Sequence, residues 1–387
     1  MTAAVSFRGV RKRYGAGQAG AMTAAVSFRG VGKRYAGRAV LDGVDLDCAP
    51  GRITALCGPP AAGKSVLLRL LVGLETPDAG RILVSGTDVT LADPGRRKLG
   101  YVPQSFALFP QWSVFDNIAY PLTVRGASRA AARSRVERLA ALLGLEAALG
   151  KRPDALSGGQ KQRAALARGL VREADAFVLD DPLVGLDFKL RERLVDDLKR
   201  LRVEYGAAFL YATSDSLEAL AVADDIAVLD GGRVVEHGPA EAIYHRPQAL
   251  RSAEIVGFPR CNVLPGTVDR DGRCRTGLGS FRLAGAAAPG PVSIAVRPEH
   301  FEPATEPGGL DVQAVVRLVE DLGAELVVHF DAGGGDGSAL DTGALVTVLP
   351  AASAGAVELD GTLPLSVRPD NLAVFVPDGA RLGNGAA

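Results

Sequence analysis

Short apolar runs alternate with longer segments of helical spacing over most of the chain, a pattern typical of α/β proteins. Ser128–Leu143, rich in Ala, Arg and Leu, predicts an amphipathic helix that ends at Gly144. Residues 22–245 are therefore expected to form one α/β domain. The strands expected from the apolar runs of this domain are 53–57, 98–102, 176–179, 208–212 and 226–229.

The pattern changes near Arg246, where helical periodicity fades and Gly, Pro and short β-branched runs take over. This change predicts a second domain, a small all-β barrel over residues 246–376. A flexible loop is expected at residues 332–338, and a loose tail at 377–387. The strands expected in this domain are 292–296, 312–319, 326–330, 345–349 and 372–376.

The chain begins with an internal repeat, because Met1–Val10 recurs letter for letter as Met22–Val31. Only the second copy continues into the apolar segment Ala39–Leu46. A unit present twice is no solenoid. We interpret residues 1–21 as a duplicated, poorly ordered extension, with a functional extra strand as the rival reading.

Composition narrows the class of protein. The chain has 387 residues, enough for two or three domains, with 44 basic and 44 acidic side chains. This balance gives no argument for binding nucleic acid. The four cysteines show no C-x-x-C spacing, so a reducing compartment is the default. The first residues predict no signal peptide, and no apolar run reaches the length of a spanning helix.

A glycine-bounded loop carries the clearest chemistry. It follows the apolar run Ile53–Cys57 and precedes the helix-like segment Val66–Val72. This context is the one that a phosphate-binding P-loop requires, with backbone N–H groups at a helix start facing the phosphates. Lys64 is expected to reach the β- and γ-phosphates, and Ser65 to help hold Mg²⁺. The expected nucleotide-binding residues of this loop are Gly58, Pro59, Pro60, Ala61, Ala62, Gly63, Lys64, Ser65 and Val66.

Two further motifs support this interpretation. An apolar strand ends in Asp180 and Asp181, where the first acid can hold Mg²⁺ and the second can polarise water. Alone, such aspartates are more often solvated turn formers. The other motif is Leu156–Gln160, LSGGQ, in which Ser157 can cap a helix and create a second phosphate site. The residues expected there are Ser157, Gly158, Gly159 and Gln160.

The LSGGQ motif, placed between the P-loop and the paired aspartates, resembles that of the ABC ATPase family. The resemblance covers Val26 to about Val376. It implies a mixed sheet with a helical subdomain, ATP and Mg²⁺ as ligands, and two ATPase subunits that sandwich ATP between one P-loop and the other LSGGQ. Soluble ABC ATPases of DNA repair or ribosomes usually carry long coiled coils or two cassettes in one chain, and neither is present.

The resemblance assigns further residues. It implies that Tyr35 stacks on adenine and that Gln104 senses Mg²⁺ and the γ-phosphate. The structural alternatives are a core or rim aromatic for Tyr35 and a solvated loop glutamine for Gln104. Asp187 matches a loop that touches the partner subunit, although it could simply cap a helix. Phe106–Ile118 resembles the surface that grips a permease, and packing beneath the helical subdomain is its alternative.

The C-terminal segments Arg260–Pro265 and Val296–Glu299 resemble the oligonucleotide-fold appendage of maltose-type ATPases. That subfamily imports sugars, polyols or glycerol phosphate. Iron, sulfate or polyamine import stays open, because related tails occur there. The resemblance places the protein at the cytoplasmic face of the inner (plasma) membrane, held there by transmembrane permease subunits. No basic, aromatic face argues for nucleic acid.

Several active-site residues depart from the family pattern. Asp181 stands where Glu is usual, and the shorter side chain draws the carboxylate back by about 1 Å, enough to slow hydrolysis roughly a hundredfold. Ser214 stands where a switch histidine is usual. In the P-loop, Ala61 replaces Gly where positive φ is costly, Pro60 removes an N–H, and Val66 replaces Thr.

These departures predict a site that binds nucleotide but hydrolyses it slowly, whereas LSGGQ is intact. Because that motif serves the partner's nucleotide, we hypothesise a heterodimer with a second, complete ATPase subunit. A homodimer that tolerates both substitutions and a mainly regulatory nucleotide-binding subunit are the alternatives.

Overall fold

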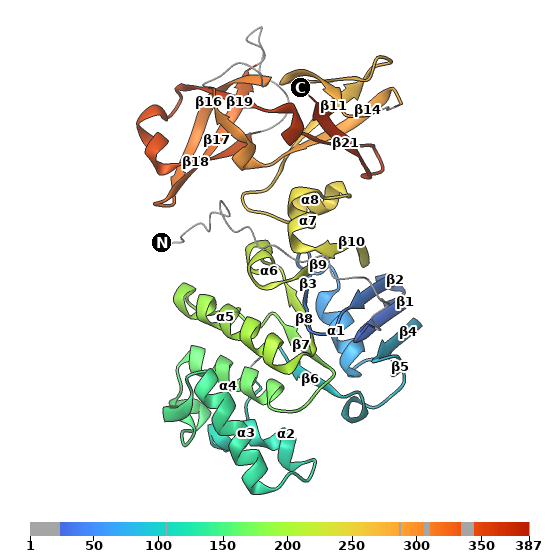
Figure 1. Ribbon diagram of the computed structural model, residues 1–387, viewed down its shortest axis with the longest axis vertical. Helices are drawn as coiled ribbons and strands as arrows, with labels where there is room; N and C mark the ends of the chain where they lie inside the picture. The colour runs from blue at the N-terminus through green and yellow to red at the C-terminus, as the bar shows by residue number, and fades with distance from the viewer. Residues whose placement is uncertain (1–23, 106, 286–287, 305–309, 334–343, 387) are drawn as a thin grey trace. The chain divides into compact units, whose positions relative to one another are not determined.

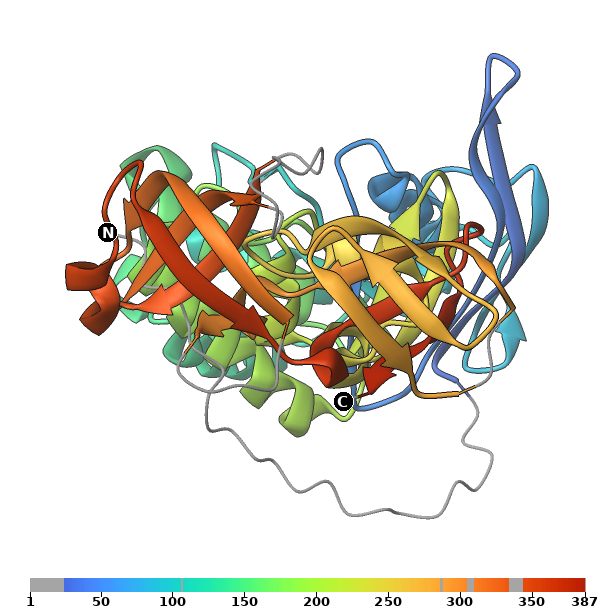
Figure 2. The same ribbon diagram turned by 90° about the horizontal axis from the view of Figure 1, so that it is seen from above.

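The structure is a computed structural model, and it describes residues 24–386 except 106, 286–287, 305–309 and 334–343 (Figures 1 and 2). The described residues form two compact units, which meet in the sequence between Ala240 and Glu241. The expected extension at 1–21 and most of the loop expected at 332–338 lie outside the described residues.

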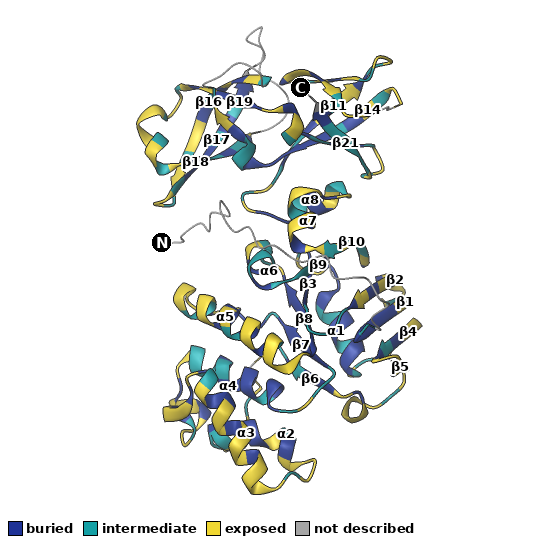
Figure 3. Cartoon of the chain, viewed as in Figure 1, coloured by how far each residue is buried: buried dark blue, intermediate teal, exposed yellow. Residues whose placement is uncertain are grey.

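A six-stranded sheet forms the centre of the N-terminal unit. Its inner strands are buried along their whole length, as expected for parallel strands with both faces covered (Figure 3). All five strands expected in this domain are confirmed to within one residue at either end. The strands, in sheet order, are β10 (Arg233–Pro239), β9 (Asp225–Asp230), β3 (Ile53–Cys57), β8 (Ala208–Thr213), β7 (Ala176–Asp180) and β6 (Leu99–Val102).

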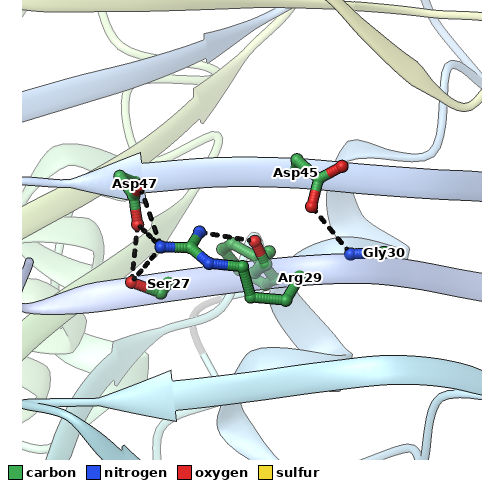
Figure 4. A network of polar contacts seen from close by, with 6 residues as sticks. Ser27, Arg29, Gly30, Asp45 and Asp47 are labelled. Carbon is green, nitrogen blue, oxygen red and sulfur yellow. Dashed lines mark hydrogen bonds and ion pairs between the residues drawn. The ribbon is translucent and has the colours of Figure 1, made fainter.

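A second, antiparallel sheet belongs to the same unit. A polar network crosses its β1–β2 pair: Ser27 donates to Asp47 at 2.6 Å, and Arg29 reaches the same carboxylate at 2.7 Å (Figure 4). The Arg29 and Asp47 side chains are about half exposed, so their ion pair stabilises the sheet only weakly. The buried face sets the register. The strands, in order, are β2 (Arg38–Cys48), β1 (Val26–Tyr35), β4 (Ala79–Val84) and β5 (Thr87–Asp88).

Among its described residues, the N-terminal unit also contains six α-helices. One apolar core packs α1 together with strands of both sheets, and another joins α2–α5 to the opposite side of the central sheet (Figure 1). The helix predicted over 128–143 is confirmed as α3, capped by the Ser128 hydroxyl. The helices are α1 (Lys64–Val72), α2 (Val114–Thr123), α3 (Arg129–Leu142), α4 (Gly158–Leu170), α5 (Phe188–Tyr205) and α6 (Ser216–Val222).

The C-terminal unit is an all-β unit preceded by two short helices, α7 (Ala240–His245) and α8 (Leu250–Ile255). A closed barrel lies beside a five-stranded sheet in both views, and one apolar core joins them (Figures 1 and 2). The predicted all-β barrel is confirmed, but a separate five-stranded sheet packs against it in the same unit. The barrel strands are β11 (Asn262–Val268), β12 (Arg273–Thr276), β13 (Gly279–Leu283), β21 (Arg381–Ala386), β20 (Ala373–Phe375) and β14 (Gly290–Val296).

The second sheet contains three of the five strands expected in this domain, as parts of β16, β17 and β18, and the other two form β14 and β20 of the barrel. Its members are β15 (Phe301–Pro303), β19 (Thr362–Val367), β16 (Leu310–Asp321), β17 (Glu325–Gly333) and β18 (Leu345–Pro350).

The prediction of a loose tail at residues 377–387 is wrong. Strand β21 pairs with β13 and with β20 and thereby closes the barrel. An open edge would leave a row of unpaired backbone groups, and β21 satisfies them. The sequence pattern missed this strand because its residues, RLGNGA, are neither alternating nor β-branched.

Asn262 joins the barrel to the second sheet. Its amide donates to the Val346 carbonyl at 2.8 Å, and its side-chain oxygen accepts from the Val346 N–H at 2.7 Å. The side chain is 6% exposed, so it satisfies backbone groups that little water can reach.

Asn262→Ala is therefore expected to destabilise the C-terminal unit by roughly 1–3 kcal/mol, because it leaves buried backbone groups unpaired. Hydrogen exchange at the Val346 amide should accelerate accordingly. Gln313→Ala, at an exposed position of the same sheet, is the control. Equal exchange in the two variants would contradict the assignment.

Candidate functional site

The P-loop ends where α1 begins. Gly63 precedes the helix with φ of 104° and offers no side-chain cap, so the first-turn N–H groups are open to an anion. A Cβ at Gly58 would lie 2.1 Å from the Leu229 carbonyl oxygen, so only glycine fits there. Ala61 has φ of 64°, which confirms the expectation that a non-glycine residue takes up positive φ in this loop.

Lys64 is folded back on its own loop. Its Nζ donates to the Gly58 carbonyl at 2.7 Å, to the Pro59 carbonyl at 2.9 Å and to the Ser214 hydroxyl at 2.9 Å. An ammonium group has three hydrogens, so these contacts satisfy it. Burial lowers the pKa of Lys64. Ser214 is thus brought directly beside the P-loop lysine.

Ser65 and Asp180 meet across the sheet edge. The Ser65 hydroxyl donates to Asp180 Oδ1 at 2.9 Å. Burial raises the pKa of Asp180, and the Ser65 hydrogen bond opposes that rise. Among the described residues no three His, Cys, Asp or Glu side chains form a metal-ligand cluster. The pair nevertheless supplies the hard oxygen donors that Mg²⁺ prefers beside a nucleotide.

Asp181 adopts a strained backbone conformation, with φ of 50°. Its N–H donates to the Ala212 carbonyl at 2.9 Å, which fixes the turn after β7. Gln104 Nε2 lies 3.5 Å from Asp181 Oδ2, a long hydrogen bond. Burial raises the pKa of Asp181, and the charge of Asp180 adds to the rise. The structure therefore groups Gln104 and Asp181 at the same edge as Lys64.

Tyr35 stands apart from this group. Its ring is 40% exposed, and its hydroxyl bonds to Glu75. Glu75 in turn accepts from Arg69 Nε on α1 at 2.6 Å. Sequence reasoning missed Glu75 and Arg69, because no spacing or motif connects them to a tyrosine 40 residues upstream. An exposed aromatic face tethered to the P-loop helix is suited to stacking.

The LSGGQ segment forms the start of α4, and the predicted Ser157 cap is confirmed. Ser157 and Gln160 make a reciprocal capping box. Among the described residues, no hydrogen bond or ion pair joins residues 157–160 to Lys64 or Ser65. One helical turn on, Gln162 donates to the Pro182 carbonyl, which links α4 to the turn after Asp181.

A buried polar group lies behind the site, and sequence reasoning missed it. Tyr211 on β8 donates to Glu218 on α6, and both side chains are almost fully buried. Asp215 caps α6 and accepts from Arg191 Nη1 at 3.3 Å. Burial raises the pKa of Glu218 to about 7, with the charges of Asp215 and Asp181 adding to it. The sequence offered one signal for Glu218, which is its position three residues after the helix-capping Asp215.

An apolar groove of about 400 Å³ lies on the helical subdomain side of the unit. Phe109, Trp112 and Tyr120 form an aromatic cluster with ring centroids 4.5–5.2 Å apart, each ring 37–38% exposed. Phe109 and Tyr120 line the groove. Phe106 lies outside the described residues. Asp187 caps α5 through its side chain, which confirms the alternative prediction of a helix cap at this position.

A lysine and a serine at a helix start, facing an aspartate at the end of a nearby parallel strand, are shared by the P-loop ATPases. The fold and the site place the chain in that class.

Comparison with known proteins defines the family. Residues 41–184 match the family described as ABC transporter, and residues 294–375 match the TOBE domain. The sn-glycerol-3-phosphate import ATP-binding protein UgpC of Chromohalobacter salexigens is 37% identical over 300 residues, covering 76% of this chain and 80% of that protein. UgpC 1 of Rhizobium johnstonii is 38% identical over 337 residues, covering 85% of each.

The chain therefore belongs to the ABC transporter ATP-binding proteins, a family of ATPases, and it carries their C-terminal barrel domain. The resemblance to the carbohydrate-importer type is confirmed. A dimeric structure of MJ0796, described as a bacterial ABC transporter cassette, matches with a TM-score of 0.52 and 28% identity, covering 56% of this chain and 98% of that one. Its post-hydrolysis state, bound to ADP and Pi, matches with a TM-score of 0.51.

Glu218 predicts a pH dependence of stability. Its folded-state pKa of about 7 lies above the unfolded value of 4.5, so the folded state favours the protonated form. The favourable contribution is complete below the unfolded value and is lost as pH rises through the folded value. Relative to wild type, Glu218→Gln should therefore gain up to about 3 kcal/mol between mildly acidic and mildly basic pH.

Urea denaturation across that pH range measures this difference. Glu192→Gln, an exposed position on α5, is the control and should follow the wild-type curve. Parallel curves for Glu218→Gln and wild type would show that the Glu218 carboxyl titrates normally.

Proposed function

We propose that this chain is the ATP-binding subunit of an ABC importer that takes up a sugar, a polyol or a glycerol-type compound. The support is the similarity to import proteins named for sn-glycerol-3-phosphate, together with the TOBE match. An importer of iron, sulfate or polyamine is the alternative. Among the described residues, no helix has the length and apolar character needed to cross a membrane.

ATP and Mg²⁺ would bind at the P-loop edge of the central sheet. Lys64 would exchange its loop acceptors for phosphate oxygens, and the open first turn of α1 would receive the phosphate charge. Ser65 and Asp180 would hold Mg²⁺, with Gln104 near the same position. The bound metal would neutralise charge on the transferring phosphoryl group. Tyr35 would stack on the adenine.

The chain's own site is proposed to hydrolyse slowly. The observation that carries this proposal is the 2.9 Å contact between Ser214 and Lys64. This contact puts a hydroxyl group, where the family usually has an imidazole, beside the P-loop lysine. Asp181 stands where it could polarise water, but its carboxylate is short, and its raised pKa disfavours the charged form. Binding without efficient catalysis follows from this arrangement.

A second ATPase subunit is the proposed partner. The LSGGQ segment is fully formed at the start of α4, yet it lacks contact with this chain's P-loop residues among those described. It would therefore cover the nucleotide of a partner that supplies its own complete catalytic residues. A heterodimer is favoured by this asymmetry, and a homodimer or a mainly regulatory subunit is the alternative.

Transmembrane permease subunits would hold the protein at the cytoplasmic face of the inner (plasma) membrane. The groove lined by Phe109 and Tyr120 is proposed as their docking surface, because exposed aromatic clusters of this kind mark interfaces.

Restoring the missing groups should raise hydrolysis. Asp181→Glu combined with Ser214→His is expected to increase the steady-state ATPase rate of the isolated chain by about tenfold to a hundredfold. Lys64→Ala in the same background should abolish the gain, because it removes the phosphate contact. If the double variant hydrolyses no faster, the P-loop substitutions at Ala61, Pro60 and Val66 set the rate.

Nucleotide binding and turnover can be separated. The isolated wild-type chain should retain a fluorescent ATP analogue with Mg²⁺ in a filter or fluorescence assay, yet turn it over slowly. Addition of a complete ATPase subunit from the same importer should raise turnover, and a Ser157→Arg change in this chain should prevent that rise. Rapid hydrolysis by the lone chain would refute the heterodimer, and failure to retain nucleotide would refute the proposed function.

A further inference from the structure

Tyr35 lies at the end of β1, where the connection between α1 and β4 holds the backbone in place. The Gly32 carbonyl accepts from the Asp78 N–H at 2.9 Å, and the Arg34 N–H donates to Asp78 Oδ2 at 2.6 Å. These two hydrogen bonds fix the main chain that leads into Tyr35. The orientation of its ring then depends on what holds the side chain.

Glu75 holds that side chain. One of its carboxylate oxygens accepts from the Tyr35 hydroxyl, and the other accepts from Arg69 Nε at 2.6 Å. Burial acts to raise the pKa of Glu75, but the hydrogen bonds from Tyr35 and Arg69 outweigh it and lower the pKa below its usual value. Glu75 is therefore a charged acceptor at neutral pH, and hydrogen bonds to charged acceptors are about twice as strong as neutral ones.

This hydrogen bond orients the Tyr35 ring without covering it. The phenolic oxygen lies in the plane of the ring, so a bond to it meets the ring at its edge and leaves both faces uncovered. Lys33 Nζ lies over one face, 5.6 Å from the ring centroid, and is held there by the Thr76 carbonyl at 2.7 Å. A flat partner would therefore stack on the opposite face of this residue, which is 40% exposed.

Arg69 connects Glu75 to the phosphate end of the site. It lies on α1, as Lys64 does, roughly one and a half helical turns further along. Burial raises the pKa of Asp180, and the positive charge of Arg69 opposes that rise together with the Ser65 hydrogen bond. Arg69 is therefore within electrostatic range of the proposed Mg²⁺ ligand. One helix carries both the phosphate-binding lysine and the anchor of Glu75.

We propose that Glu75, held by Arg69, is a positioning residue that fixes the Tyr35 ring to receive the base of the nucleotide. This inference rests on the proposed binding of ATP at the P-loop. A free tyrosine side chain loses rotamer freedom when a base stacks on it, and that loss weakens binding. Glu75 removes this freedom when the chain folds. It therefore contributes to the affinity for the base without touching it.

A residue that only braced the connection after α1 would behave differently. Loss of such a brace would disturb the P-loop helix and would weaken binding of the phosphates and of the base alike. Magnesium ATP and magnesium tripolyphosphate separate the two roles, because tripolyphosphate offers phosphates without a base. Calorimetric titration of the full chain with each ligand measures both affinities.

Glu75→Ala should weaken ATP binding about twofold to tenfold and leave tripolyphosphate binding unchanged. Tyr35→Phe keeps the ring and removes the hydroxyl, so it should cause the same loss. The double variant should lose no more than either single variant, because both changes break one contact. Glu146→Ala and Tyr205→Phe make the same replacements at exposed positions elsewhere in the unit and should bind both ligands as wild type does.

Tyr35→Ala tests the stacking itself. It removes the ring as well as the hydroxyl, so it should weaken ATP binding by about tenfold or more, beyond the loss in Tyr35→Phe. Its affinity for tripolyphosphate should again equal that of the wild type.

Four results would overturn the role assigned to Glu75. They are wild-type ATP affinity in Glu75→Ala, equal losses for the two ligands, additive losses in the double variant, and equal ATP affinities in Tyr35→Ala and Tyr35→Phe. The proposed function survives each of them as long as the wild-type chain binds ATP. Failure of the wild-type chain to bind ATP would refute the proposed function and this inference with it.

Discussion

Three parallel strands end in register at one edge of the central sheet, and the site depends on that register. Cys57 of β3 pairs with Thr213 of β8, and Ala212 of β8 pairs with Asp180 of β7. The residues that follow the strand ends are therefore neighbours across the sheet. A shift of one residue would turn each of these side chains to the other face. Burial of all three strands on both faces is what holds the register.

Desolvation then sets the chemistry at this edge. Burial lowers the pKa of Lys64 and raises those of Asp180 and Asp181, so each charged form needs a partner. Lys64 finds carbonyls and the Ser214 hydroxyl, and Asp180 finds Ser65. A nucleotide with Mg²⁺ would supply stronger partners of the same kinds. In the proposed function, Asp181 and Ser214 would leave this binding chemistry in place and would act more weakly on water than the glutamate and histidine usual at these positions.

The same reasoning extends to polar groups away from the P-loop. Asn262 lies at a junction between sheets and is satisfied by backbone groups, which is a structural use of a buried amide. Arg172 is half-buried, and its Nε and Nη2 atoms have no hydrogen-bond partner among the described residues. Asn262 and Arg172 thus differ in whether the fold supplies partners for their buried polar atoms.

Local pattern was sufficient to predict five strands of the central sheet, helix α3, the α4 cap, the barrel strands β14 and β20 and the P-loop turn, because apolar runs, capping residues and glycines act over a few positions. The sequence alone also showed which residue types stand at 61, 181 and 214. Only the tertiary structure decided that Ser214 contacts Lys64, that Glu75 and Arg69 hold Tyr35, and that Glu218 is buried against Tyr211. It likewise made residues 381–386 a barrel strand. The physical reason is that these contacts join residues distant in the chain, through strand pairing and burial that no local spacing encodes.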